Sequence, residues 1–227
     1  MARGIFFIEA GPDAYTYREP AALRCGARIA NISRWPSPAL RVEMAFGGAS
    51  TREEIEPVPP GGAVSREWVP ATGLRQGKGT VVVRLGEGSK PLDAIATPVA
   101  VWRPRPEGQR RFVTVRDGDF WLDGRKWYPH GVNYMPSSGI AASDHAYFEY
   151  WLGAKSYDPE IIQRDLERIK DIGFNTVSVF IYHRSLGANN LLDFLRRCDE
   201  LGLKVNLSIR PGTPMHDDYW PRWKEII

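Results

Sequence analysis

Short runs in which apolar and polar residues alternate fill the first part of the chain. Residues 40–46 place leucine, valine, methionine and phenylalanine at every second position, with arginine and glutamate among the residues between them. This alternation predicts a strand with one buried and one solvent-facing side. Similar β-favouring runs occur at residues 27–32, 64–69 and 80–85. Because glycine- and proline-rich turns such as 57–62 separate these runs, we expect residues 1–106 to form an immunoglobulin-like β-sandwich.

The pattern changes at about residue 107. Two Asp-Gly pairs, at Asp117 and Asp123, lie between short apolar runs, and such pairs favour the type I′ turns of tight hairpins. A further strand is expected at residues 127–134. A loop of about two dozen residues, rich in small and aromatic side chains, then leads to Asp158.

Helical periodicity begins after this loop. Asp158 and Pro159 are typical of a helix start, and the apolar spacing of residues 162, 166 and 169 predicts a helix that stops at Gly173. A second helix is expected from about 190 to 201, and a third begins near 217. Continuous apolar strands are expected at 176–182 and 203–210. The order β-α-β-α-β predicts parallel strands joined by right-handed crossovers.

Composition narrows the class of protein. The chain is 43% hydrophobic and 25% charged, which excludes a disordered or collagen-like chain. The net charge is +3 with scattered basic residues, so we expect no nucleic-acid partner. The longest apolar run is too short to span a membrane, and no signal peptide precedes Glu9. We therefore expect a cytoplasmic protein, or a secreted one whose signal is missing from this sequence.

The two cysteines carry no recognisable chemistry. Cys25 and Cys198 are far apart in sequence, and no Cys-x-x-Cys pair is present. We expect both to be buried small hydrophobic residues. No metal site and no cofactor are predicted.

Four motifs follow one another in the second part of the chain: residues 115–127 (VRDGDFWLDGRKW), 130–134 (HGVNY), 165–177 (DLERIKDIGFNTV) and 198–205 (CDELGLKV). In order and spacing they resemble the opening of the catalytic barrel of the clan A glycoside hydrolases. These are retaining enzymes built on an eight-stranded β/α barrel. Arg210, followed by Pro-Gly, is similar to the end of the third strand in the family 35 β-galactosidases. The nearest resemblance is to family 35 and family 5-like β-glycosidases.

The resemblance implies an incomplete TIM barrel with about three βα units in residues 107–227. It implies the N-terminal fragment of a retaining hydrolase that acts on β-linked glycosides or polysaccharides, with a carbohydrate as its partner. Many clan A members have an arginine where this chain has Ser178. That difference argues against the families that use the arginine and leaves room for the family 35 group.

The catalytic residues of such enzymes are expected to be missing. The family's two carboxylates end the fourth and seventh strands, whereas this chain reaches only the third, so no catalytic residue is assigned and no activity is expected from these 227 residues alone. The substrate-binding residues are expected where the strands end and in the long loop. They are Asn133, Tyr134, Trp151, Tyr182, His183 and Arg210.

Two other interpretations remain open. The chain can be a non-catalytic carbohydrate-binding or interaction protein with a degenerate barrel segment. It can also belong to another class of parallel α/β enzyme, in which case a strand order such as 2-1-3 is expected.

Overall fold

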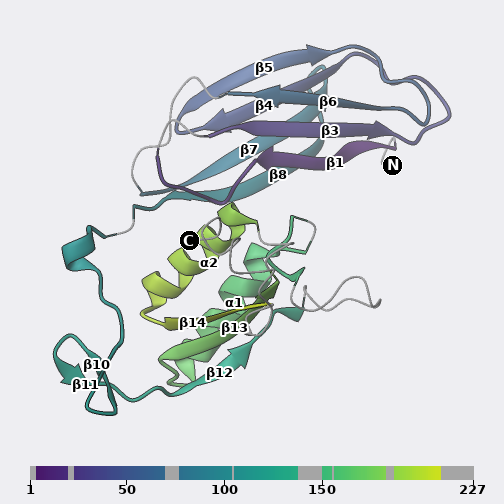
Figure 1. The fold of residues 1–227 in the computed structure, drawn as a ribbon. Coiled ribbons are helices and arrows are strands. Elements are labelled where there is room, and N and C mark those ends of the chain that lie inside the picture. The colour runs from purple at the N-terminus through teal and green to yellow at the C-terminus, as the bar shows by residue number, and fades with distance from the viewer. Residues whose placement is uncertain are drawn as a thin grey trace, which may run out of the picture. The chain divides into compact units, whose positions relative to one another are not determined.

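The computed structural model describes residues 4–19, 23–69, 77–103, 105–137, 150–154, 156–182 and 187–210. The chain divides into two compact units, Met1–Arg103 and Pro104–Ile227. Figure 1 shows a β-rich first unit and a second unit in which helices and parallel strands alternate. Among the described residues, no helix is long and apolar enough to cross a membrane.

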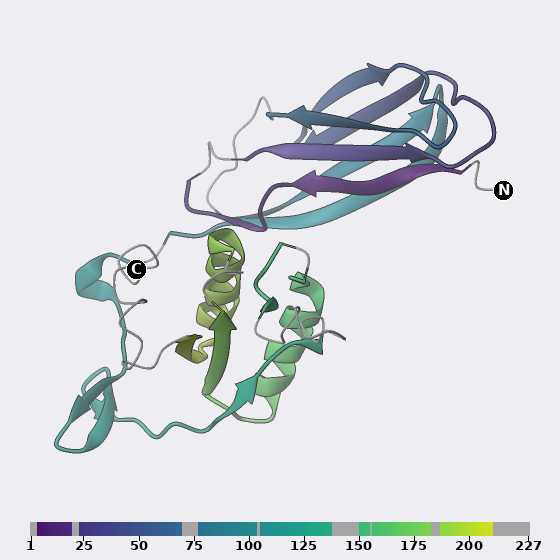
Figure 2. The same cartoon turned by 45° about the vertical axis from the view of Figure 1, so that its right-hand side comes forward.

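Two sheets face each other in the first unit (Figures 1 and 2). The smaller is antiparallel and has the order β1-β3-β6, with a bulge in β1 between Phe7 and Glu9. The larger has five strands in the order β2-β8-β7-β4-β5. The strands of the smaller sheet are β1 (Ile5–Pro12), β3 (Cys25–Asn31) and β6 (Ala63–Trp68). Those of the larger are β2 (Thr16–Tyr17), β4 (Leu40–Phe46), β5 (Ala49–Ile55), β7 (Gly77–Glu87) and β8 (Lys90–Val101).

The core of this unit comes from the alternation that the sequence displays. In β4, Leu40, Val42, Met44 and Phe46 are all buried, and the residues between them are partly exposed. Alternate residues of β3 and β7 pack into the same core. Each such side chain contributes roughly 1.5–3 kcal/mol on burial. The expectation of a β-sandwich-like first unit is confirmed.

Two carboxylates connect the sheets at opposite edges. Glu53 of β5 accepts hydrogen bonds from Arg66 Nε (2.9 Å) and Trp68 Nε1 (2.7 Å) of β6. Asp93 of β8 accepts one from the backbone N–H of Phe7 (2.9 Å), beside the β1 bulge. Side chains of one sheet thus bind groups of the other at both sides of the sandwich.

The second unit begins with a short 3-10 turn, η2 (Glu107–Gln109), and a three-stranded antiparallel sheet. Asp117 and Asp123 have positive φ angles (51° and 53°), as do the glycines after them, which confirms the two Asp-Gly turns. The three strands are β9 (Thr114–Arg116), β10 (Asp119–Leu122) and β11 (Arg125–Lys126).

A β-α-β-α-β segment follows. Its three strands are parallel and adjacent in the order β12-β13-β14. The strands are β12 (Gly131–Tyr134), β13 (Thr176–Tyr182) and β14 (Lys204–Arg210), and the helices are α1 (Pro159–Asp171) and α2 (Ala188–Leu201). The described part of the chain therefore contains an open three-stranded parallel sheet and no closed barrel. Residues 211–227, where a third helix is expected, lie outside it.

The helix ends follow the capping signals of the sequence. The Asp158 side chain accepts hydrogen bonds from the backbone N–H groups of Glu160 and Ile161 (both 3.0 Å), and Pro159 occupies the first turn. Gly202 ends α2 in the left-handed conformation at φ 68°. Helix α2 starts at Ala188, two residues before the expected position, because the Gly187 N-cap region already begins the turn.

Both helices cover the same face of the parallel sheet. Val177, Val179 and Ile181 of β13 are fully buried. Tyr134, in register with Val179, contacts Asp165 of α1 through its hydroxyl and stacks on Phe194 of α2. Since side chains alternate along a strand, Ser178 and Phe180 are directed to the other face.

Candidate functional site

A polar row crosses the sheet face that the helices leave uncovered. Asn133 of β12, Ser178 of β13 and Asn206 of β14 are in register on three neighbouring strands. Asn206 Nδ2 donates a hydrogen bond to Ser178 Oγ (3.2 Å). Both asparagines are exposed, and the Asn133 amide has no hydrogen-bond partner among the described residues. The sequence predicts Asn133 as a binding residue; Ser178 and Asn206 were not predicted as such.

The register of this row is fixed at the amino ends of the strands. The side chain of Asn175 accepts a hydrogen bond from His130 N (2.9 Å) and donates one to Tyr128 O (2.8 Å). Its backbone N–H donates to His130 O, and its carbonyl accepts from Lys204 N, both at 2.8 Å. Asn175 therefore ties together the starts of all three parallel strands.

The position of β12 is also fixed by the close approach of its backbone to that of β13. A Cβ at Gly131 would overlap the carbonyl oxygen of Thr176, its register partner on β13. Only glycine leaves room for the two backbones at this point. The position of Asn133, two residues later, depends on this contact.

The row suits recognition of a hydroxyl-rich ligand. Its members are amides and a hydroxyl, which both donate and accept hydrogen bonds and carry no charge. Neighbouring strands are about 4.8 Å apart, so the row repeats polar groups at a spacing similar to that between alternate hydroxyls of a sugar ring. With no titratable group, the row can bind and orient a ligand but cannot transfer a proton.

Above this row the strands continue to their carboxyl ends. Phe180 and Ser208 form the next register pair on the same face, and the Phe180 ring is partly exposed. Tyr182 and Arg210, both predicted as binding residues, form the last pair, so the backbone brings them together. Their side chains, and all of His183, lie outside the described residues.

Trp151 and Tyr134, predicted among the sugar-facing residues, lie inside the second unit. Trp151 is 0% exposed, and its Nε1 donates to the backbone carbonyl of Phe180 (3.1 Å). Its ring meets Phe194 edge-on with centroids 5.0 Å apart, and Tyr134 stacks on Phe194 at 6.3 Å. Neither ring offers a face to a ligand in this structure, because both are part of the packing beneath the helices.

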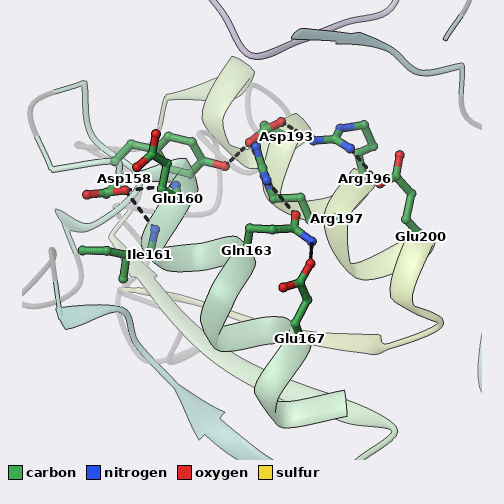
Figure 3. Close-up of polar contacts among 10 residues, drawn as sticks. Asp158, Glu160, Ile161, Gln163, Glu167, Asp193, Arg196, Arg197 and Glu200 are labelled. Atoms are coloured by element: carbon green, nitrogen blue, oxygen red, sulfur yellow. Dashed lines mark hydrogen bonds and ion pairs between the residues drawn. The ribbon is translucent and has the colours of Figure 1, made fainter. Parts of the chain in front are cut away.

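A carboxylate with several hydrogen-bond partners also lies on the helix side. Asp193 is 0% exposed and accepts hydrogen bonds from Tyr157 (2.6 Å), Arg196 (2.9 Å) and Arg197 (2.7 Å), as Figure 3 shows. Arg197 also donates to Gln163 of α1 (2.7 Å). The network therefore joins α2 to α1 and to the segment before α1. Its signal in the sequence is an aspartate among the apolar residues of a helix face.

Among the described residues, no group of three or more His, Cys, Asp or Glu side chains could hold a metal ion. Cys25 and Cys198 are buried free thiols, as expected. Burial, reinforced by the charge of Asp13, raises the pKa of Cys25 to about 11, and burial raises the pKa of Cys198 further.

Comparisons with known proteins give weak structural likenesses. No protein-family model matches the sequence, and no curated protein matches it. The exo-chitosanase of Amycolatopsis orientalis aligns at TM-score 0.44 and 14% identity, over 91% of this chain and 23% of that one. A β-glucuronidase from glycoside hydrolase family 2 aligns at 0.41 and 14%, over 98% and 22%. A family 2 β-galacturonidase of Eisenbergiella tayi aligns at 0.36 and 17%, over 90% and 33%. The chain thus spans a third or less of each.

Proposed function

We propose that the chain is the N-terminal part of a retaining glycoside hydrolase that acts on β-linked glycosides. In this proposal the sandwich precedes a β/α barrel, and β12, β13 and β14 are its first three strands. The strand order supports this, because a barrel adds parallel strands side by side in chain order. A doubly wound sheet reverses direction near its first strand.

The observation that carries the proposal is the polar row opposite the helices. In a doubly wound sheet, helices cover both faces and both faces are apolar. In a barrel, helices cover one face and the other is directed to the interior, which side chains fill, and the substrate binds at the carboxyl ends of the strands. Asn133, Ser178 and Asn206 make the uncovered face polar, which suits a substrate with many hydroxyls.

The residues take different roles in this proposal. Asn133 and Asn206 bind sugar hydroxyls through their amides, and Ser178 orients Asn206 by accepting its hydrogen bond. Ser178 is small, so the position where many clan A members have arginine stays open for substrate. Tyr182, His183 and Arg210 remain proposed binding residues at the mouth.

The bond cleavage requires groups that the first three strands do not provide. Retaining hydrolysis uses two carboxyl groups about 5–5.5 Å apart, one as nucleophile and one as acid and base. In the family that the sequence resembles, these end the fourth and seventh strands. We therefore place them on later strands of a longer protein.

The test compares two lengths of the same protein. One is the 227-residue chain; the other includes roughly 150 further residues of the gene, enough for a whole barrel of about 250. Both are assayed with nitrophenyl β-glycosides of neutral, amino and acidic sugars. We expect turnover by the longer protein alone, with proton NMR showing that the first sugar released keeps the β configuration.

Substitutions in the polar row test whether its side chains bind the substrate. In the longer protein, Asn133→Ala and Asn206→Ala are each expected to lower kcat/KM about five- to tenfold, since one lost hydrogen bond is worth about 1–1.5 kcal/mol. Asn189→Ala, at an exposed position of α2, is the matched control. If the longer protein binds oligosaccharides but lacks the two carboxylates and turnover, the non-catalytic alternative replaces this proposal. An inverted product contradicts the retaining mechanism.

A further inference from the structure

Strand β13 continues past the end of its neighbour β12. Tyr134, the last residue of β12, is in register with Val179, and β12 has no register partner for residues 180–182. This end of β13 leads to the mouth of the proposed site, where Tyr182 and Arg210 form the last register pair. Backbone groups that no longer face a neighbouring strand need other partners to hold them in place.

A buried tryptophan from the segment before α1 supplies one such partner. Trp151 Nε1 donates a hydrogen bond to the carbonyl oxygen of Phe180 (3.1 Å). The Trp151 ring is 0% exposed, and it meets Phe194 and Tyr134 edge-on, with ring centroids 5.0 and 6.2 Å apart. The donor therefore cannot turn away from β13 without disturbing the packing between the sheet and α2.

The next residue along the chain holds the start of α2. The Leu152 carbonyl oxygen accepts hydrogen bonds from Gly187 N (3.2 Å) and from Asn190 Nδ2 (2.9 Å), and Leu152 is 1% exposed. Gly187 is the N-cap residue of α2 and has no side chain with which to cap the helix. The first turn of α2 is therefore fixed by a carbonyl group from outside the helix.

This contact requires glycine at position 187. A Cβ there would lie 2.9 Å from the Leu152 carbonyl oxygen and 3.0 Å from Asn190 Nδ2. The φ angle of Gly187 is −81°, a value that any residue adopts. The close approach of Leu152, and not the backbone conformation, therefore excludes a larger side chain.

Both contacts come from a turn with its own hydrogen bonds. Gly153 N donates to Tyr150 O (2.8 Å), and the Gly153 carbonyl accepts from Ser156 N (3.2 Å) and Tyr157 N (3.1 Å). The Tyr157 hydroxyl then binds Asp193, further along α2 (2.6 Å). The turn at residues 150–153 is thus fixed to α2 at a second point.

We propose that the turn at residues 150–153 is the positioning element of the ligand site at the carboxyl end of the parallel sheet. Its adjacent residues hold the two sides of one connection: Trp151 binds the end of β13, and Leu152 binds the start of α2. Tyr182 lies close behind the Phe180 carbonyl, so the turn sets where the mouth begins. The role toward a ligand rests on the proposed function, whereas the hold on strand and helix does not.

Hydrogen exchange in the full 227-residue chain tests the contacts without any activity. Trp151→Phe keeps an aromatic ring and removes the Nε1 donor, and it is expected to speed amide exchange at residues 180–182 about five- to tenfold. Asn190→Ala is expected to do the same at Gly187. Exchange at the other end of β13 should not change. The exposed neighbour Asn189→Ala is the matched control and should have no effect.

Kinetics of the longer protein test the positioning role. A displaced binding group weakens the substrate and the transition state alike, so Trp151→Phe is expected to raise KM about five- to tenfold and leave kcat unchanged. Gly187→Ala is expected to raise KM likewise. Ile162→Val removes a buried methylene group of α1 but none of these hydrogen bonds. It should lower the unfolding midpoint and leave KM unchanged, which separates positioning from a general loss of stability.

Each outcome decides one part of the proposal. Unchanged exchange in Trp151→Phe and Asn190→Ala overturns it, because the turn would then hold neither strand nor helix. In an active longer protein, unchanged KM in Trp151→Phe, or an equal rise in Ile162→Val, overturns the positioning role. If exchange changes as expected but the longer protein neither cleaves nor binds glycosides, the proposed function fails together with the role toward a ligand. The hold of the turn on β13 and α2 is then still supported.

Discussion

The Tyr157 hydroxyl donates a 2.6 Å hydrogen bond to Asp193, 36 residues further along the chain, and both groups are buried. The bond ties the segment before α1 to α2. Arg196 and Arg197 bind the two oxygens of the same carboxylate. The packing beneath the parallel sheet is thus specified by directional contacts as well as by apolar burial.

Removal of the Asp193 charge is expected to destabilise the second unit strongly. Asp193→Asn leaves two nearly buried guanidinium groups without their shared anion, and breaking a buried pair in this way costs about 3–5 kcal/mol. Tyr157→Phe removes one hydrogen bond and is expected to cost about 1–3 kcal/mol. Urea unfolding followed by circular dichroism measures both. Glu160→Gln, on the exposed side of α1, is the control, and equal stability of Asp193→Asn and wild type would refute the assigned role.

The close approach at Gly131 gives a second prediction. Gly131→Ala is expected to lower the free energy of unfolding by at least about 1–3 kcal/mol, because the new methyl group would overlap the Thr176 carbonyl. Gly108→Ala is the matched control, since no atom lies within 4 Å of its added Cβ. Its effect is expected to stay within about 0.5 kcal/mol. Similar unfolding midpoints for the two variants would show that β12 can move away from β13.

Three buried tyrosines predict a loss of stability at alkaline pH. Tyr17, Tyr134 and Tyr157 each donate a hydrogen bond to an aspartate. Burial, followed by the neighbouring carboxylates, raises the pKa of all three. Their contribution to stability is complete below the unfolded-state pKa of about 10, and it decreases as the pH rises above that value.

Absorbance at 295 nm measures the ionisation of the tyrosine side chains directly. The three phenols are expected to ionise only when the protein unfolds, so their titration should coincide with the loss of circular dichroism. Ionisation of all nine tyrosines in one step near pH 10, in a protein that stays folded, contradicts the buried hydrogen bonds.

The two thiols are expected to be inert in the folded protein. With a pKa of about 11, only about one in a thousand Cys25 side chains is ionised at pH 8, and Cys198 less still. A disulfide-exchange reagent at pH 8 should therefore react at the rate of unfolding. In urea it should titrate two thiols rapidly. The variant Cys198→Ala retains Cys25 as its one thiol. Rapid reaction of the folded variant with the reagent would show that the Cys25 thiol of β3 is accessible.

Local patterns predicted the β-sandwich-like first unit and several helix and strand positions of the second unit. The alternation in β4, the Asp158 cap and the Gly202 stop each act within a few residues, so the sequence displays them directly. Helix α2 begins earlier than expected because its N-cap region contains Gly187, and none of the usual capping side chains marks the boundary.

The candidate site was less accessible to sequence interpretation. Trp151 and Tyr134 follow or lie near a strand end, which suggests a ligand role, but whether an aromatic ring is covered depends on residues far away such as Phe194. Ser178 and Asn206 were missed because their importance arises from register with Asn133, which no single strand reveals. The Asp193 network likewise exists only once α1 and α2 are packed.

The bond between Asp93 and Phe7 has a consequence for behaviour at high concentration. β1 is the edge of its sheet, where free N–H groups can recruit a strand from a second molecule. The bulge between Phe7 and Glu9 interrupts the ladder, and the Asp93 carboxylate occupies the Phe7 N–H. A strand arriving from another copy therefore meets a broken set of donors, and this edge resists fibril-like growth.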